Sequence, residues 1–232
     1  MRRLVLPLVL LAALVVPTVA GARPRQASAP RGTVYVTERQ LGSVTALDAA
    51  TGAVRWTTTV GATPIGVTRP RGTHKVYSSD EGAGQMSVLD RRTGRLLRTI
   101  PMGLLPHHLM ASSNGRRIYV GEFGQNTVGV IDTRRDRLLA HWVANPLANA
   151  RTHAVFITRN GKHLYTTNTR AVRTEIGDVA HLDARTGRLL CNTTVGADPS
   201  EILVTPTAGP ATSRCARSTR SRSSTSAAAA RG

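Results

Sequence analysis

The sequence predicts an all-β protein, a β-propeller of four-stranded blades, because one pattern recurs four times and no segment has helical periodicity. The marker tyrosines are 42, 42 and 46 residues apart. Four short strands in a repeat of about 42 residues is the size of a propeller blade. A β-sandwich is the alternative, but it gives no reason for near-identical units. The marker residues are Tyr35, Tyr77, Tyr119 and Tyr165, followed by Asp48, Asp90, Asp132 and Asp183.

Within a unit, the expected strands follow one another in a fixed order. A strand such as "RIYVGE" comes first, then an alternating strand such as "TVGVID", then a turn beginning at the marker aspartate, and then a strand such as "RLLRTI". An apolar run after a proline, such as "PIGVT", closes the unit before a tight turn such as "SSNG". Because the aspartates recur in every unit, we expect them to accept turn hydrogen bonds.

The repeats divide the chain into units 32–72, 73–115, 116–161 and 162–209, within a repeat region of residues 30–209. The first unit begins at "TVYVTE" and lacks a leading inner strand. The last unit ends in "SEILVT" (Ser200 to Thr205), which we expect to be an inner strand without followers. The third unit has Arg135-Asp136 where the others have Thr-Gly.

The units "VYVTE…SVTALDAATGAV" and "IYVGEFGQNTVGVIDTRRDRL" resemble the YVTN-type propeller repeats of exported bacterial proteins of the YncE-like family, which are WD40-like in architecture. The resemblance covers Gly32 to Gly209. It implies about seven blades. With about four blades present, the resemblance implies an incomplete or strained ring.

The chain begins with features of a secretory signal peptide, residues 1–29. Arg2 and Arg3 precede an apolar run, and small residues follow at Ala20-Gly21-Ala22 and Ala27-Ser28-Ala29. We therefore expect a secreted or extracytoplasmic protein, with the membrane involved only through this segment.

The last residues, 210–232, contain five arginines, no acidic residue and no large apolar residue. We expect a disordered basic tail. If its codons are GC-rich, a shifted reading frame from Arg217 would encode V-D-A-V-E-V-V-D-V, so the tail is also a candidate for a frameshift product. Cys215 lies in this tail, so we do not expect it to pair with Cys191.

The repeat region is basic, with 22 basic and 13 acidic residues. Such a surface attracts anions. Along the sequence the arginines fall singly or in pairs at expected turns rather than in clusters, which favours a solvated surface. Nucleic acid is not expected as a partner, because the tail has no aromatic residue to stack on a base. Asp80-Glu81 is expected to be a solvated loop.

The candidate ligand site lies where the inner strands begin. His107 and His153 lie twelve residues before the marker tyrosines of their sheets, where the second unit has Ile65. Counting back from Gly209 adds Glu201, and His108 adjoins His107. These groups could bind a metal ion, for which His107 and His153 are the only candidates, or a polar small molecule. The alternative is a wet channel lined by polar residues, and no cofactor is predicted.

Two functions stay open at this point. The first is an exported binding or scaffold module for an unknown protein or small molecule, with no catalytic residue identified. The second is a lactonase-like or metal- or quinone-dependent enzyme with its site at the central channel, for which "PHHL" is a weak resemblance and no GxSxG or HExxH motif is present. An inactive truncated product is a further alternative.

Overall fold

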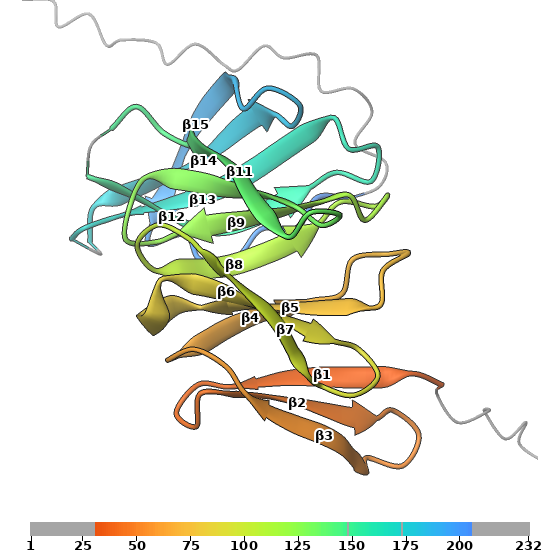
Figure 1. Cartoon of the computed structure of the whole chain (residues 1–232). Helices are drawn as coiled ribbons and strands as arrows, with labels where there is room; N and C mark the ends of the chain where they lie inside the picture. Colours follow the sequence, from red (N-terminus) through yellow and green to blue (C-terminus); the bar gives the residue numbers. More distant parts are fainter. Residues whose placement is uncertain (1–30, 148, 173, 206–232) are drawn as a thin grey trace, which may run out of the picture. The chain divides into compact units, whose positions relative to one another are not determined.

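Strands and tight turns make up the part of the chain that the computed structural model describes, residues 31–147, 149–172 and 174–205. The strands form four antiparallel sheets, one of three strands and three of four strands (Figure 1). In each sheet the strands lie in chain order. The expected all-β propeller architecture is therefore confirmed. Within the described ranges the one helix is a 3₁₀ turn, η1 (Glu81–Ala83).

The sheets are offset from the repeat units, because the last strand of each unit is the first strand of the next sheet. The first sheet therefore has three strands, as the missing leading strand predicts. The strands of the first and second sheets are β1 (Thr33–Glu38), β2 (Ser43–Asp48), β3 (Val54–Thr59), β4 (Pro64–Thr68), β5 (Lys75–Asp80), β6 (Gln85–Asp90) and β7 (Leu96–Pro101). Those of the third and fourth are β8 (Pro106–Ala111), β9 (Arg117–Glu122), β10 (Thr127–Asp132), β11 (Arg137–Val143), β12 (Ala150–Ile157), β13 (His163–Arg170), β14 (Ile176–Asp183) and β15 (Leu189–Ala197).

The first strands of successive sheets lie next to one another. β1 contacts β4, β4 contacts β8, and β8 contacts β12. Apolar side chains fill the space between sheets, as between the second and third sheets. There the buried cluster contains Tyr77, Met86, Val88, Ile100, Leu109, Ile118, Val120 and Ile131.

Two ends of the sheets are distinguished below. The mouth end is where β5 and β9 end and where β4 and β8 begin. The turn end is where β2, β6, β10 and β14 end at their marker aspartates. At the turn end each aspartate accepts the backbone N–H groups two and three residues later, as Asp90 does from Arg92 at 3.0 Å and Thr93 at 2.8 Å. The predicted turn role of the aspartates is confirmed.

A repeated hydrogen bond joins the first, second and fourth sheets to the chain segment that follows each of them at the mouth end. Thr37 on β1 donates to the carbonyl of Ile65 at 2.9 Å, and Ser79 on β5 donates to the carbonyl of His107 at 2.5 Å. After the fourth sheet, Thr167 on β13 donates in the same way to the carbonyl of Ser200 at 3.1 Å. Ser200 is thus the structural equivalent of His107.

The expected strand Ser200 to Thr205 does not form, although residues 198–200 follow the same path as the start of an inner strand. Asp198, like Leu105, has a positive φ immediately before a proline. Residues 201–205 are not in a strand. A strand needs a hydrogen-bonded neighbour, and no described residue supplies one here.

Three other expectations fall partly or wholly outside the residues that the structure describes. The signal peptide, residues 1–29, and the tail, residues 210–232, lie outside the described residues. The expectation that Cys191 and Cys215 do not pair also depends on Cys215, which lies outside the described residues. No helix within the described ranges has the length and apolar character that a membrane span requires.

Candidate functional site

The first strands of the third and fourth sheets place two histidines together at the mouth end. His107 follows Pro106 at the start of β8, and His153 lies near the start of β12. Their ring centroids are 4.4 Å apart. The sequence prediction that these two residues share one position in neighbouring blades is therefore confirmed in geometry, while ligand binding there stays a prediction.

Phe123, directly after β9, completes an aromatic cluster that sequence reasoning missed. Its ring is 5.7 Å from His107 and meets His153 edge-on at 5.5 Å. The guanidinium of Arg151 lies 5.6 Å from the centre of the Phe123 ring, within the range of a cation–π interaction. The sequence signal was its place two residues after the glycine of "YVGEF", but nothing local showed which way the ring would point.

The two histidines have different hydrogen-bonding states. His153 Nδ1 lies 2.8 Å from the carbonyl oxygen of Ser200, so this nitrogen carries a proton and donates it. The Nδ1 atom of His107 is buried and has no hydrogen-bond partner among the residues that the structure describes. Burial, together with the nearby charges of His153, His108 and Arg39, lowers the pKa of His107 to about 4. His107 is therefore neutral at pH 7.

The other two candidate residues lie apart from this cluster. His108 points to the opposite side of β8, where its Nδ1 accepts the backbone N–H of Val155 at 3.3 Å. Burial lowers the pKa of His108, and the charge of Glu201 opposes this shift. Glu201 is exposed, and by the equivalence of Ser200 with His107 it matches His108. The count back from Gly209 placed Glu201 at the position of His107, and this placement was therefore wrong by one residue.

Two carboxylates at the mouth end, those of Glu122 and Asp80, are fully buried and stabilise the fold. Glu122 is 0% exposed and accepts hydrogen bonds from the Gly103 backbone at 2.9 Å, from Gln125 at 3.1 Å and from Thr127 at 2.5 Å, with His141 Nδ1 at 2.7 Å. These bonds tie β9 to the connection between two sheets.

Asp80 has the same place in the second sheet, and its expected solvation was wrong. It is 0% exposed and accepts from the Gly61 backbone at 3.0 Å and from Ser87 at 2.6 Å. Glu81 is 9% exposed and pairs with Arg39 at 3.1 Å. In the fourth sheet the buried carboxylate is that of Asp178 on β14, which accepts hydrogen bonds from Asn145 in the preceding connection at 2.6 Å and from Asn168 on β13 at 2.7 Å.

Large apolar side chains are exposed at the same mouth end as the aromatic cluster. Leu104 is 64% exposed and Leu105 is 38% exposed, both in the connection between β7 and β8. Leu41, at 74% exposure, borders a cavity of about 690 Å³ that Arg39 also lines. We call this surface the mouth patch, and its members are Leu41, Leu104, Leu105, Phe123, Leu147, His107 and His153.

The remaining histidines were expected at the surface, and one pair is not. His181 is 6% exposed, and its Nε2 lies 3.0 Å from Nδ1 of His163. Its ring stacks on Tyr165 at 4.5 Å. Burial and the neighbouring His163 lower the pKa of His181. Within residues 31–147, 149–172 and 174–205, no group of three or more His, Cys, Asp or Glu side chains is placed to hold a metal ion.

Comparison with known proteins agrees with the propeller architecture. The family model described as outer membrane protein assembly factor BamB matches residues 13–230. No curated protein matches the chain. Among solved structures, Kuenenia stuttgartiensis hydrazine synthase is similar, with a TM-score of 0.65 and 22% identity over 71% of this chain. The chain spans 46% of that protein's length, and at this identity the likeness shows the fold alone.

Proposed function

The chain belongs to the family of the outer membrane protein assembly factor BamB, and from this premise we propose that it is a non-catalytic propeller module that binds a protein partner through the mouth patch. The observation that carries the proposal is the exposure of Leu104 and Leu41, at 64% and 74%, at the same end of the sheets as the cluster of His107, Phe123 and His153. Contiguous exposed apolar patches mark interaction surfaces, and the proposal is that these side chains form one.

The composition of the mouth patch favours a protein over a small polar ligand. Protein-binding hot spots are rich in aromatic residues and arginine, within a polar rim. Here Phe123 lies under Arg151, and the side chain of Arg39 is 64% exposed at the border of the patch. We therefore expect the partner to present an aliphatic or aromatic anchor together with a carboxylate.

Export and repeat type are parts of the same proposal. The basic and apolar start of the chain supports removal of residues 1–29 as a signal peptide, and the Val-x-Asp-x-x-Thr-Gly pattern supports the YVTN type of repeat. Mass spectrometry of the protein secreted by a bacterial host tests export. A new N-terminus just after Ala22 or Ala29 supports it, whereas an intact Met1 in the cytoplasm contradicts it.

The binding proposal is tested by selecting peptides from a displayed random library on the purified full chain. We expect enriched peptides to combine an apolar anchor with Asp or Glu. Their affinity should fall at least tenfold with the double substitution Leu104→Ser and Phe123→Ala, because both anchors of the patch are then lost.

The matched control is Val54→Ala with Leu96→Ser, which also removes two exposed apolar groups, 64% and 41% exposed, but at the turn end. Circular dichroism establishes that both variants fold. Peptides that bind the wild type and the Leu104 and Phe123 variant equally well would overturn the proposal, and so would the absence of any enriched motif.

A further inference from the structure

The fold separates the charges that the sequence leaves scattered. Because neighbouring strands alternate in direction, the arginines at successive turns all come to one end of the sheets. Seventeen of the described lysines and arginines lie at the turn end, against five acidic residues. The five are Asp48, Asp90, Asp132, Asp136 and Asp183.

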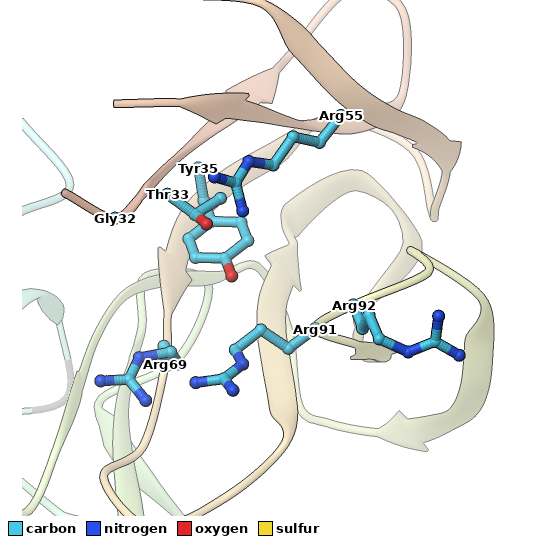
Figure 2. A pocket seen from close by; sticks show the side chains of 7 residues that line it. All are labelled: Gly32, Thr33, Tyr35, Arg55, Arg69, Arg91 and Arg92. Atoms are coloured by element: carbon cyan, nitrogen blue, oxygen red, sulfur yellow. The ribbon is translucent and has the colours of Figure 1, made fainter. Parts of the chain in front are cut away.

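A cavity opens at the turn end between the first and second sheets. Its volume is about 520 Å³. Figure 2 shows Arg55 on one side, Arg91 reaching toward the hydroxyl end of Tyr35, and Arg69 on the same side as Arg91. No acidic residue lines it. The lining residues are Gly32, Thr33, Tyr35, Arg55, Arg69, Arg91 and Arg92.

Most of the positive charge at this cavity is not neutralised. Arg55 pairs with Asp48 at 2.5 Å. Arg69, Arg91 and Arg92 form no ion pair with any carboxylate of the described residues. Guanidinium groups that share a cavity repel one another, and a bound anion would relieve that repulsion.

The hydroxyl of Tyr35 is a second, independent sign of a missing partner. In the next sheets the equivalent hydroxyls are bonded, that of Tyr77 to the carbonyl of Thr133 at 3.3 Å and that of Tyr119 to the carbonyl of Ala184 at 2.9 Å. The equivalent carbonyl for Tyr35 belongs to Arg91, and it accepts the indole N–H of Trp56 at 3.2 Å. Among the described residues the Tyr35 hydroxyl has no hydrogen-bond acceptor, so its O–H is available to a ligand.

At the neighbouring interface, a carboxylate of the chain itself lies beside the equivalent tyrosine hydroxyl. Between the second and third sheets, the carboxylate of Asp136 lies 2.5 Å from the Tyr77 hydroxyl and 2.6 Å from Lys75 Nζ. The residue equivalent to Asp136 in the second sheet is Gly94, which brings no anion to Tyr35. The interface between the first two sheets thus has the cations and the hydroxyl without the carboxylate.

We propose that this turn-end cavity binds a phosphate group, carried either by a small phosphate ester or by a lipid headgroup. Arg69 and Arg91 supply planar donors that match phosphate oxygens in pairs, and Tyr35 supplies a further O–H donor. The site lies at the opposite end of the sheets from the mouth patch. One module could thus hold a protein partner at one end and a phosphate-bearing ligand at the other.

The test uses the full chain with inorganic phosphate as the probe. Phosphate binding is measured by calorimetry. The midpoint of thermal unfolding in phosphate is compared with the midpoint in sodium chloride of equal ionic strength. Phosphate is expected to raise the unfolding midpoint above the chloride value. The double substitution Arg69→Gln and Arg91→Gln is expected to weaken phosphate binding at least tenfold. The control, Arg98→Gln with Arg159→Gln, removes the same charge elsewhere and should change the affinity less than twofold.

Two results would overturn the site. One is an equal effect of phosphate and chloride, and the other is equal phosphate binding by the two double variants. Vesicles then separate the sources of the phosphate. Co-sedimentation with phosphatidylglycerol vesicles but not phosphatidylcholine vesicles, lost in the Arg69 and Arg91 variant, assigns a lipid headgroup. Phosphate binding without vesicle binding assigns a soluble ester.

Discussion

Asp136 of the third repeat unit reaches the second sheet, where its carboxylate oxygen lies 2.5 Å from the hydroxyl of Tyr77. Its other oxygen lies 2.6 Å from Lys75 Nζ. This explains why the third unit departs from the Thr-Gly pattern. Asp136 has a left-handed backbone conformation, with a φ of 49°, and its side chain links two blades.

The link predicts the effect of Asp136→Ala. Lys75 and Tyr77 would lose their shared acceptor in a place where the Lys75 and Asp136 side chains are only 14% and 15% exposed. We expect a loss of about 2 kcal/mol in the free energy of unfolding, measured by urea denaturation. A double-mutant cycle with Tyr77→Phe is the control, and additive effects of the two substitutions would contradict a direct interaction.

A second prediction compares two turn glycines. Gly52 and Gly187 have φ values of 72° and 76°, but a Cβ at Gly187 would lie 2.3 Å from the Trp142 ring, whereas one at Gly52 meets nothing within 4 Å. Both alanine variants share the conformational cost. Gly187→Ala should therefore be less stable than Gly52→Ala by about 1–3 kcal/mol, with an altered Trp142 fluorescence spectrum. Equal losses would show that the indole does not pack on this turn.

A third prediction concerns the close approach of the third and fourth sheets beside the candidate site. A Cβ at Gly121 would lie 2.7 Å from the carbonyl oxygen of His153, which is backbone and cannot move aside alone. Gly121→Ala should cost about 1–3 kcal/mol in unfolding free energy and shift the NMR resonances of His153. Gly196→Ala, where a Cβ meets nothing within 4 Å, is the control. Unchanged His153 resonances would argue against the contact.

The features predicted correctly from sequence are those that local contacts determine. The turn at Asp90 depends on hydrogen bonds to residues two and three positions later, so its signature lies within one short stretch. The shared position of His107 and His153 followed from the repeat period alone. In both cases the information is contained in the spacing of residues along the chain.

The features that were missed depend on partners distant in sequence. The strand expected at Ser200 to Thr205 has the right composition, but strand formation also needs a paired neighbour. The burial of Asp80 follows from its bond to the Gly61 backbone in the preceding connection. The basic turn end was not foreseen, because arginines separated by about 42 residues come together only when the strand directions are known.

The last prediction concerns pH and His107. Its folded pKa of about 4 lies below the ordinary value of 6.5, mainly because of burial. As pH falls below 6.5, the unfolded imidazole takes up a proton that the folded one does not. The stability that His107 contributes is therefore complete above about pH 6.5 and is lost as pH falls toward 4.

The His107→Gln variant should consequently lose less stability than the wild type between pH 7 and pH 4.5, measured by urea denaturation at each pH. Other titrating groups are common to both proteins, so the difference reports His107 alone. NMR titration of the imidazole should give a midpoint near 4. In His153→Gln that midpoint should rise only slightly, because removal of one neighbouring charge leaves the burial in place. A wild-type midpoint near 6.5, or parallel pH profiles for the two proteins, would mean that His107 is solvated and that the aromatic cluster is open to water.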